Sequence, residues 1–201
     1  MDFKKAIREY YEREIAVINA LNLDEINDAM NVILDTYNRK GTIYICGNGG
    51  SASTASHFQN DFNKGISEYV DNKFRFCCLN DNVATIMAIA NDIGYEEVFR
   101  FQLKNKITSN DLFIGISGSG NSKNVVNAAE YAKECGAKVV GITGYKGGKL
   151  KELSDYKMHV DECDMQIDED IHMTFDHMMM KIFYNYLTKH VITGDNINDK
   201  H

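Results

Sequence analysis

The sequence predicts one α/β domain, a three-layer sandwich in which helices cover both faces of a central five-stranded parallel sheet. Short apolar runs alternate with amphipathic stretches through the middle of the chain, which is typical of strand–helix–strand crossovers in a parallel sheet. The 201 residues correspond to about one domain. Hydrophobic residues make up 44% and charged residues 25% of the chain, which is an ordinary globular composition.

Two amphipathic helices are predicted before the first strand. Apolar residues recur at spacings of three and four between residues 3 and 18, and again between residues 23 and 37. Asn22 or Asp24 can cap the second helix. We expect these helices, over residues 1–40, to form a hairpin that buries its apolar faces against the main domain or another subunit.

The main domain is predicted over residues 41–190, followed by a polar tail over residues 191–201. Five short apolar runs are the expected strands: Thr42–Cys46, Arg75–Leu79, Leu112–Ile116, Lys138–Thr143 and Tyr156–Val160. Helical patterns lie between and after them: Ala52–Asn63, Val83–Ala90, Tyr95–Lys106, Lys123–Glu134, Lys149–Leu153 and Asp168–Thr188.

Charge and cysteine content exclude several classes of protein. The chain has 22 basic and 29 acidic residues and a net charge of −7, whereas a nucleic-acid partner requires clustered Lys and Arg. No apolar run approaches the ~18 residues of a membrane span, and charges interrupt residues 1–16, where a signal peptide needs an apolar centre. Five cysteines, two of them adjacent, indicate free thiols in a reducing compartment. We therefore expect a cytoplasmic protein.

Two predicted strands end in loops suited to binding an anion. The first strand runs into GNGGS at residues 47–51, and the third into SGSGNS at residues 117–122. Glycine permits close backbone approach, and the following helix offers free N–H groups and the positive end of its dipole. Each loop could instead be only a flexible turn, but two of them at neighbouring strand ends favour a ligand site. Neither loop has a P-loop or GxGxxG pattern, so nucleotide and NAD binding are not expected.

Histidines and carboxylates at helical spacing form a second candidate site. His57 and Asp61 are four residues apart, and Glu169 and His177 are eight apart on the last helix. Two imidazoles and two carboxylates could bind a divalent metal such as zinc, or transfer protons. Alternatively, His57 and Asp61 could be an ordinary surface pair, and the polar residues of the last helix could simply face solvent.

Three stretches resemble the SIS (sugar isomerase) domain family: ICGNGGSASTASHF at 45–58, ANDIGY at 90–95 and GISGSGNS at 115–122. The resemblance extends over nearly the whole chain. It implies a flavodoxin-like SIS fold, a homotetramer with sites at subunit interfaces, and an aldose–ketose isomerase. The reaction it implies is the conversion of sedoheptulose 7-phosphate to D-glycero-D-manno-heptose 7-phosphate, by proton transfer through an enediol. Other family members suggest an alternative, a non-catalytic phosphosugar-binding regulator or an adaptor that binds a replication initiator.

The resemblance also implies roles for individual residues. The implied substrate-binding residues are Asn48, Gly49, Gly50, Ser51, Asn91, Asp92, Ser117, Gly118, Ser119, Ser122 and Glu169, with the three serines holding the phosphate. The implied metal ligands, for zinc or a similar divalent ion, are His57, Asp61, Glu169 and His177, of which the last three are also implied to be catalytic. Asp61 falls where the family has a glutamate base, and Glu169 where it has a glutamine. The role of the base is therefore open between Asp61 and Glu169.

Overall fold

A computed structural model describes residues 1–189, and the predicted tail over 191–201 lies outside these residues. The expected five-stranded parallel sheet is confirmed, with the order β2-β1-β3-β4-β5. Each predicted strand agrees with the structure to within one residue at either end. The strands are β1 (Ile43–Cys46), β2 (Phe76–Cys78), β3 (Leu112–Ser117), β4 (Lys138–Thr143) and β5 (Tyr156–His159).

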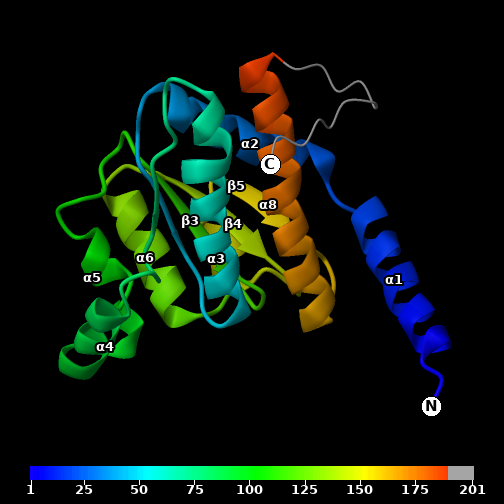
Figure 1. Ribbon diagram of the computed structural model, residues 1–201. Coiled ribbons are helices and arrows are strands. Elements are labelled where there is room, and N and C mark those ends of the chain that lie inside the picture. The colour runs from blue at the N-terminus through cyan, green and yellow to red at the C-terminus, as the bar shows by residue number, and fades with distance from the viewer. Residues whose placement is uncertain (190–201) are drawn as a thin grey trace.

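Helices cover both faces of the sheet, which confirms the three-layer architecture (Figure 1). Alternate residues of a strand point to opposite faces, so Ile43 and Ile45 enter one core while Tyr44 and Cys46 enter the other. The first core is closed by α2 (Leu23–Asn38), α3 (Gly50–Asn60) and α8 (Met165–Thr188). The second is closed by α4 (Val83–Asp92), α5 (Arg100–Leu103), α6 (Lys123–Glu134) and α7 (Gly148–Leu153).

Two predicted helices differ from those in the structure. The helix expected over Tyr95–Lys106 is reduced to a 3₁₀ turn, Tyr95–Glu97, and the single turn of α5. The helix expected over Ala52–Asn63 begins at Gly50 and changes at Asp61 into a π-helical segment, Asp61–Ile66. Such segments often lie at functional sites.

The two N-terminal helices are present, but they do not pack along each other (Figure 1). Asn22 caps α2 by accepting hydrogen bonds from the backbone N–H groups of Asp24 and Glu25. The apolar face of α2 packs against β5. Helix α1 (Lys4–Asn19) buries only Val17. As expected, α2 buries its apolar face against the main domain, whereas most of the apolar side chains of α1 stay exposed.

Polar contacts tie α1 to the region where α8 begins. The hydroxyl group of Tyr10 donates a hydrogen bond of 2.5 Å to Asp170, and Arg13 forms an ion pair with Glu162. No helix within residues 1–189 is long and apolar enough to cross a bilayer. All five cysteines are present as free thiols.

Candidate functional site

The two glycine-rich loops meet at the carboxyl edge of the sheet. Strands β1 and β3 are neighbours at the centre of the sheet, and the chain leaves them toward opposite edges, which opens a crevice where α/β proteins bind ligands. A cavity of about 240 Å³ lies there. Its walls come from both loops, from Ile116 and Tyr145, and from the start of α8: Asn48, Ser51, Ser117, Gly118, Ser119, Ser122, Met165, Asp168 and Glu169.

Hydrogen bonds hold the first loop in place. The side chain of Asn48 exchanges two hydrogen bonds of 2.9 Å with Asn124 on α6 and accepts another from the Tyr95 hydroxyl group. A Cβ atom on Gly50 would collide with the carboxylate of Glu169. The carboxylate of Glu169 therefore lies directly against the first loop in the space that a side chain at position 50 would occupy.

The second loop presents hydroxyl groups at the start of α6. The hydroxyl of Ser117 donates to that of Ser122 at 3.2 Å, and Ser122 is the residue that precedes the first turn of α6. Gly120 has a φ of 64°, a left-handed conformation that favours glycine. The hydroxyls and the N–H groups of the first helical turn together suit a phosphate group.

Four side chains from two packed helices form a cluster that could hold a metal ion: His57, Asp61, Asp176 and His177, with one ligand atom of each within 4.8 Å of the others. The two Nε2 atoms of the histidines are 3.1 Å apart. The Nε2 atom of His57 lies 3.5 Å from Asp61 and 3.8 Å from Asp176. Imidazole nitrogens and carboxylate oxygens at these separations match the ligand types of zinc.

The structure brings together three of the four implied metal ligands, His57, Asp61 and His177. Glu169 is not in the cluster and instead lines the cavity beside Gly50. Asp176, which the sequence analysis missed, completes the set. A usable signal was present in the spacing, because Asp168, His172 and Asp176 recur every four residues on α8 and so share a face.

Two implied substrate-binding residues lie elsewhere in the single chain. Asn91 and Asp92 are exposed near the end of α4, where the Asn91 side chain donates to Asp92 at 2.8 Å. Neither lines the cavity.

Burial shifts the pKa of the polar groups on the inner face of α8. Neither carboxylate oxygen of Asp176 has a hydrogen-bond partner within residues 1–189. Burial, with a contribution from the charge of Asp61, raises the pKa of Asp176 to about 8. Burial also raises the pKa of Asp168 to about 7 and lowers that of His172 to about 4. A buried carboxyl group that accepts no hydrogen bond requires a proton or a cation nearby, which suits a metal site at Asp176.

Replacing Asp176 by asparagine is expected to stabilise the metal-free protein near pH 8, with a gain that shrinks toward about pH 5. The pKa of about 8 lies above the ordinary 3.8, so the native wild-type chain loses stability as the pH rises between these values. An amide does not ionise. Thermal melts of chelator-treated protein across this range measure the effect, with Asp170→Asn as the exposed control. A constant offset at every pH would contradict the assignment.

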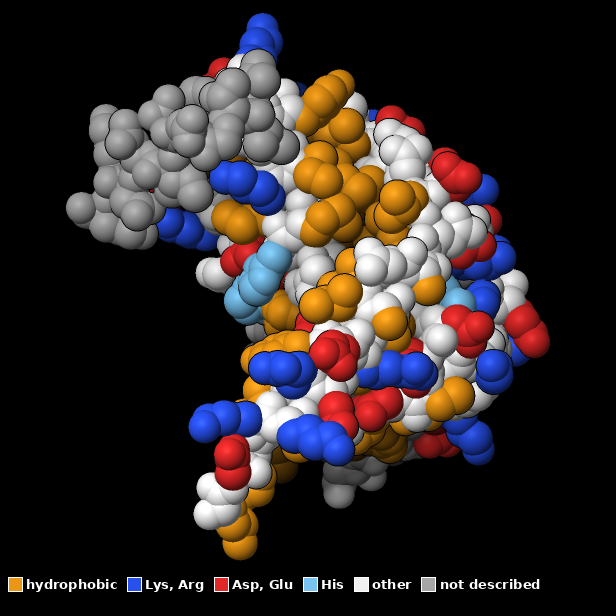
Figure 2. Space-filling view, turned by 90° about the vertical axis from the view of Figure 1, so that its right-hand side faces the viewer, with side chains coloured by type: hydrophobic (Ala, Val, Ile, Leu, Met, Phe, Trp, Pro, Cys, Tyr) orange, Lys and Arg blue, Asp and Glu red, His pale blue; other side chains and the backbone are white. Residues whose placement is uncertain are grey.

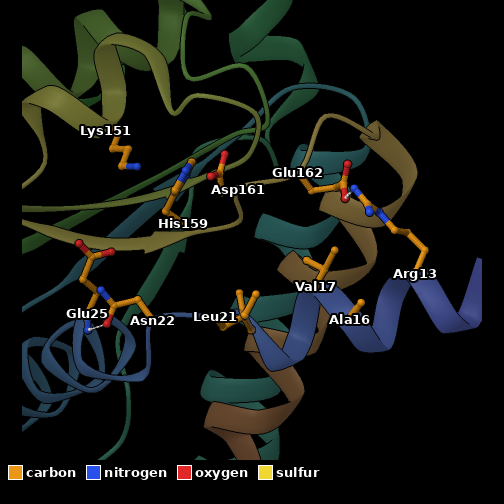
Figure 3. A pocket seen from close by; sticks show the side chains of 11 residues that line it. Arg13, Ala16, Val17, Leu21, Asn22, Glu25, Lys151, His159, Asp161 and Glu162 are labelled. Carbon is orange, nitrogen blue, oxygen red and sulfur yellow. Dashed lines mark hydrogen bonds and ion pairs between the residues drawn. The ribbon is translucent and has the colours of Figure 1, made fainter.

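A larger cavity of about 400 Å³ lies between α1, α2 and the end of β5 (Figure 3). Arg13 and Glu162 form an ion pair at one side, while Lys151 and His159 lie at the other. None of the residues implied to bind substrate or metal lines this cavity. The 240 Å³ cavity between the glycine-rich loops is therefore the candidate substrate site.

The chain is similar in sequence and in fold to known proteins. A model of the SIS domain matches residues 6–144. A phosphoheptose isomerase of Helicobacter pylori is 38% identical over 163 residues, covering 78% of this chain and 81% of the relative. That of Thermodesulfovibrio yellowstonii is 35% identical over 197 residues, covering 93% and 94%. The structure of a phosphoheptose isomerase from Francisella tularensis has a TM-score of 0.83 at 26% identity, covering 92% of this chain and 100% of that chain. The chain therefore belongs to the SIS domain family and, within it, to the phosphoheptose isomerases.

Proposed function

We propose that this protein isomerises sedoheptulose 7-phosphate to D-glycero-D-manno-heptose 7-phosphate in the cytoplasm. The observation that carries the proposal is the single cavity that joins the serine loop, the first loop and Glu169. The serine hydroxyls and the start of α6 bind the phosphate. Binding this remote group orients the sugar chain and offsets the entropy lost in positioning it.

Proton transfer between neighbouring carbons requires a base that reaches the substrate. We assign this role to Glu169, because its carboxylate lines the cavity whereas Asp61 lies in the metal cluster. Glu169 takes the proton from the carbon next to the carbonyl group and returns it to the former carbonyl carbon. His177, the most exposed member of the cluster, exchanges protons with the substrate oxygens.

The cluster of His57, Asp61, Asp176 and His177 would hold a divalent ion, and zinc fits its two imidazoles and two carboxylates. Such an ion, when bound, supplies Lewis-acid polarisation of a carbonyl oxygen. Asp176 is buried and its carboxylate accepts no hydrogen bond within residues 1–189, which supports this assignment because a cation would balance its charge.

A panel of ketose and aldose phosphates, followed by NMR in deuterated water, tests the proposed reaction. Sedoheptulose 7-phosphate is expected to give the aldose with deuterium at the carbon next to the carbonyl group. Binding of sugar phosphates without conversion or deuterium exchange would instead favour the non-catalytic regulator.

Replacing Ser119 and Ser122 by alanine is expected to weaken phosphosugar binding by about 1–3 kcal/mol for each lost hydrogen bond to the charged phosphate. Calorimetric titration with the sugar phosphate and with inorganic phosphate measures the loss. Ser109→Ala provides a control outside the cavity lining. Unchanged affinity for both ligands in the double variant would rule out the loop as the phosphate site.

We further propose that the protein is a homotetramer with substrate sites near subunit interfaces. Helix α1 projects from the domain (Figure 1), and Ile7, Tyr11 and Ile15 of this helix, like Phe3 just before it, are each exposed by more than half. Figure 2 shows hydrophobic side chains gathered on this side of the molecule. Such surfaces are typical of protein interfaces.

Light scattering at micromolar concentration is expected to give the mass of four chains. The double change Ile7→Lys and Ile15→Lys is expected to lower it, because charges replace exposed apolar side chains of α1. Lys5→Ala is the matched control on the same helix. A wild-type monomer would contradict the proposal.

A further inference from the structure

Helix α8 carries an unusual row of buried polar side chains on its inner face. Asp168, His172 and Asp176 are 0%, 1% and 0% exposed. None of their side-chain nitrogen or oxygen atoms forms a hydrogen bond of good geometry within residues 1–189, although the backbone of Tyr145 offsets part of the rise that burial causes in the pKa of Asp168. Asp176 belongs to the cluster that could hold a metal ion. Asp168, two turns earlier, is not in that cluster and needs another explanation.

Asp168 lies at the phosphate end of the candidate substrate site. It lines the 240 Å³ cavity together with Gly118 and Ser119 of the serine loop and with Tyr145. A Cβ atom on Gly144 would collide with its carboxylate, and one on Gly118 would lie 4.0 Å from it. The carboxyl group therefore occupies a niche between the ends of β3 and β4 that depends on glycine at position 144.

A buried carboxyl group whose capacity to accept hydrogen bonds is largely unfilled costs free energy, so a ligand that supplies a hydrogen-bond donor there would gain affinity. Sugar hydroxyls are such donors. We propose that Asp168 is a substrate-binding residue that accepts a hydrogen bond from the hydroxyl on the carbon next to the phosphate-bearing carbon. The placement follows from the shared wall of Asp168 and the serine loop, and it rests on the proposed function only in taking the ligand to be a phosphosugar.

Two small ligands isolate this contact from catalysis. Glycerol 3-phosphate carries a hydroxyl next to its phosphate-bearing carbon, whereas 3-hydroxypropyl phosphate does not. NMR titrations of both are compared for the wild type, Asp168→Asn and Asp168→Leu, with Asp170→Asn as the exposed control and with inorganic phosphate as a third ligand. Thermal melts identify any variant that fails to fold, and the nearly isosteric Asn variant preserves the shape of the niche.

The wild type is expected to bind glycerol 3-phosphate about 10–100-fold more tightly than 3-hydroxypropyl phosphate. The Leu variant should lose most of this preference, and the Asn variant, which keeps one acceptor oxygen, part of it. Inorganic phosphate should bind both variants at least as well as the wild type, because a negative charge is removed.

Equal wild-type affinity for the two ligands, or equal weakening of all three in the Asn variant, would overturn the role of Asp168. Absence of isomerase activity alongside the expected preference would count against the proposed reaction and leave the contact supported. Conversely, turnover of the heptose without the preference would count against the contact alone.

Discussion

Replacing Glu169 by glutamine is expected to reduce kcat by about 10²–10⁴-fold, the usual contribution of a general acid or base. The amide keeps the size of the side chain and its place beside Gly50 but cannot take a proton. Deuterium exchange at the carbon next to the carbonyl group should fall by the same factor, because Glu169 both removes the proton and returns it. Proton NMR of sedoheptulose 7-phosphate in deuterated water follows turnover and exchange together.

Two other variants make this result specific. Asp170→Asn removes the same charge from the next position, where the carboxylate faces Tyr10, and should leave kcat nearly unchanged. Asp61→Asn should lower activity together with metal content. If Glu169→Gln retains exchange while Asp61→Asn abolishes it at full metal occupancy, the base is Asp61.

Removing a histidine of the cluster is expected to cause a large loss of affinity for zinc. A residue that merely orients a metal ligand contributes about 10–100-fold to metal affinity, so loss of a ligand in His57→Ala or His177→Ala should cost at least about 100-fold. Asp176→Asn should also weaken binding, whereas Glu169→Gln should not. Zinc titration by calorimetry, with elemental analysis of the purified proteins, provides the measurement.

His159→Ala is the matched control, because this histidine lies in the separate cavity near α1. The resemblance to the family predicts the opposite result, because it implies that Glu169 is a metal ligand and does not include Asp176. Full affinity in Asp176→Asn together with a large loss in Glu169→Gln would establish Glu169 as a ligand and remove Asp176 from the set.

The sequence was most informative about the sheet and least informative about which side chains meet. Strand boundaries could be predicted because each strand is a short apolar run bounded by polar residues or glycine. The π-helical segment at Asp61 could not, because burial of Phe62 and Ile66 in the shared core depends on contacts distant in sequence. The two loops could be identified from their glycine and serine residues at strand ends, because the backbone shape of such loops depends on local residues.

Glu169 and Asp176 show where spacing alone was insufficient. Residues eight apart on a helix are rotated by about 80°, so Glu169 and His177 need not face the same point. Asp176 lies between Phe175 and His177, and three methionines follow at positions 178–180, so this carboxylate was overlooked beside an apolar stretch. The four-residue periodicity of Asp168, His172 and Asp176 was the stronger signal.

The packing of α2 against β5 affects how the chain folds during synthesis. Helix α2 ends at Asn38, whereas β5, the strand against which it packs, begins only at Tyr156. At a translation rate of about 5–20 residues per second, the intervening stretch takes roughly 6–24 s to make. During that interval the apolar face of α2 lacks its native cover, and β1 must also await β3. The nascent chain is therefore expected to depend on chaperones until β5, in the last quarter of the sequence, has emerged from the ribosome.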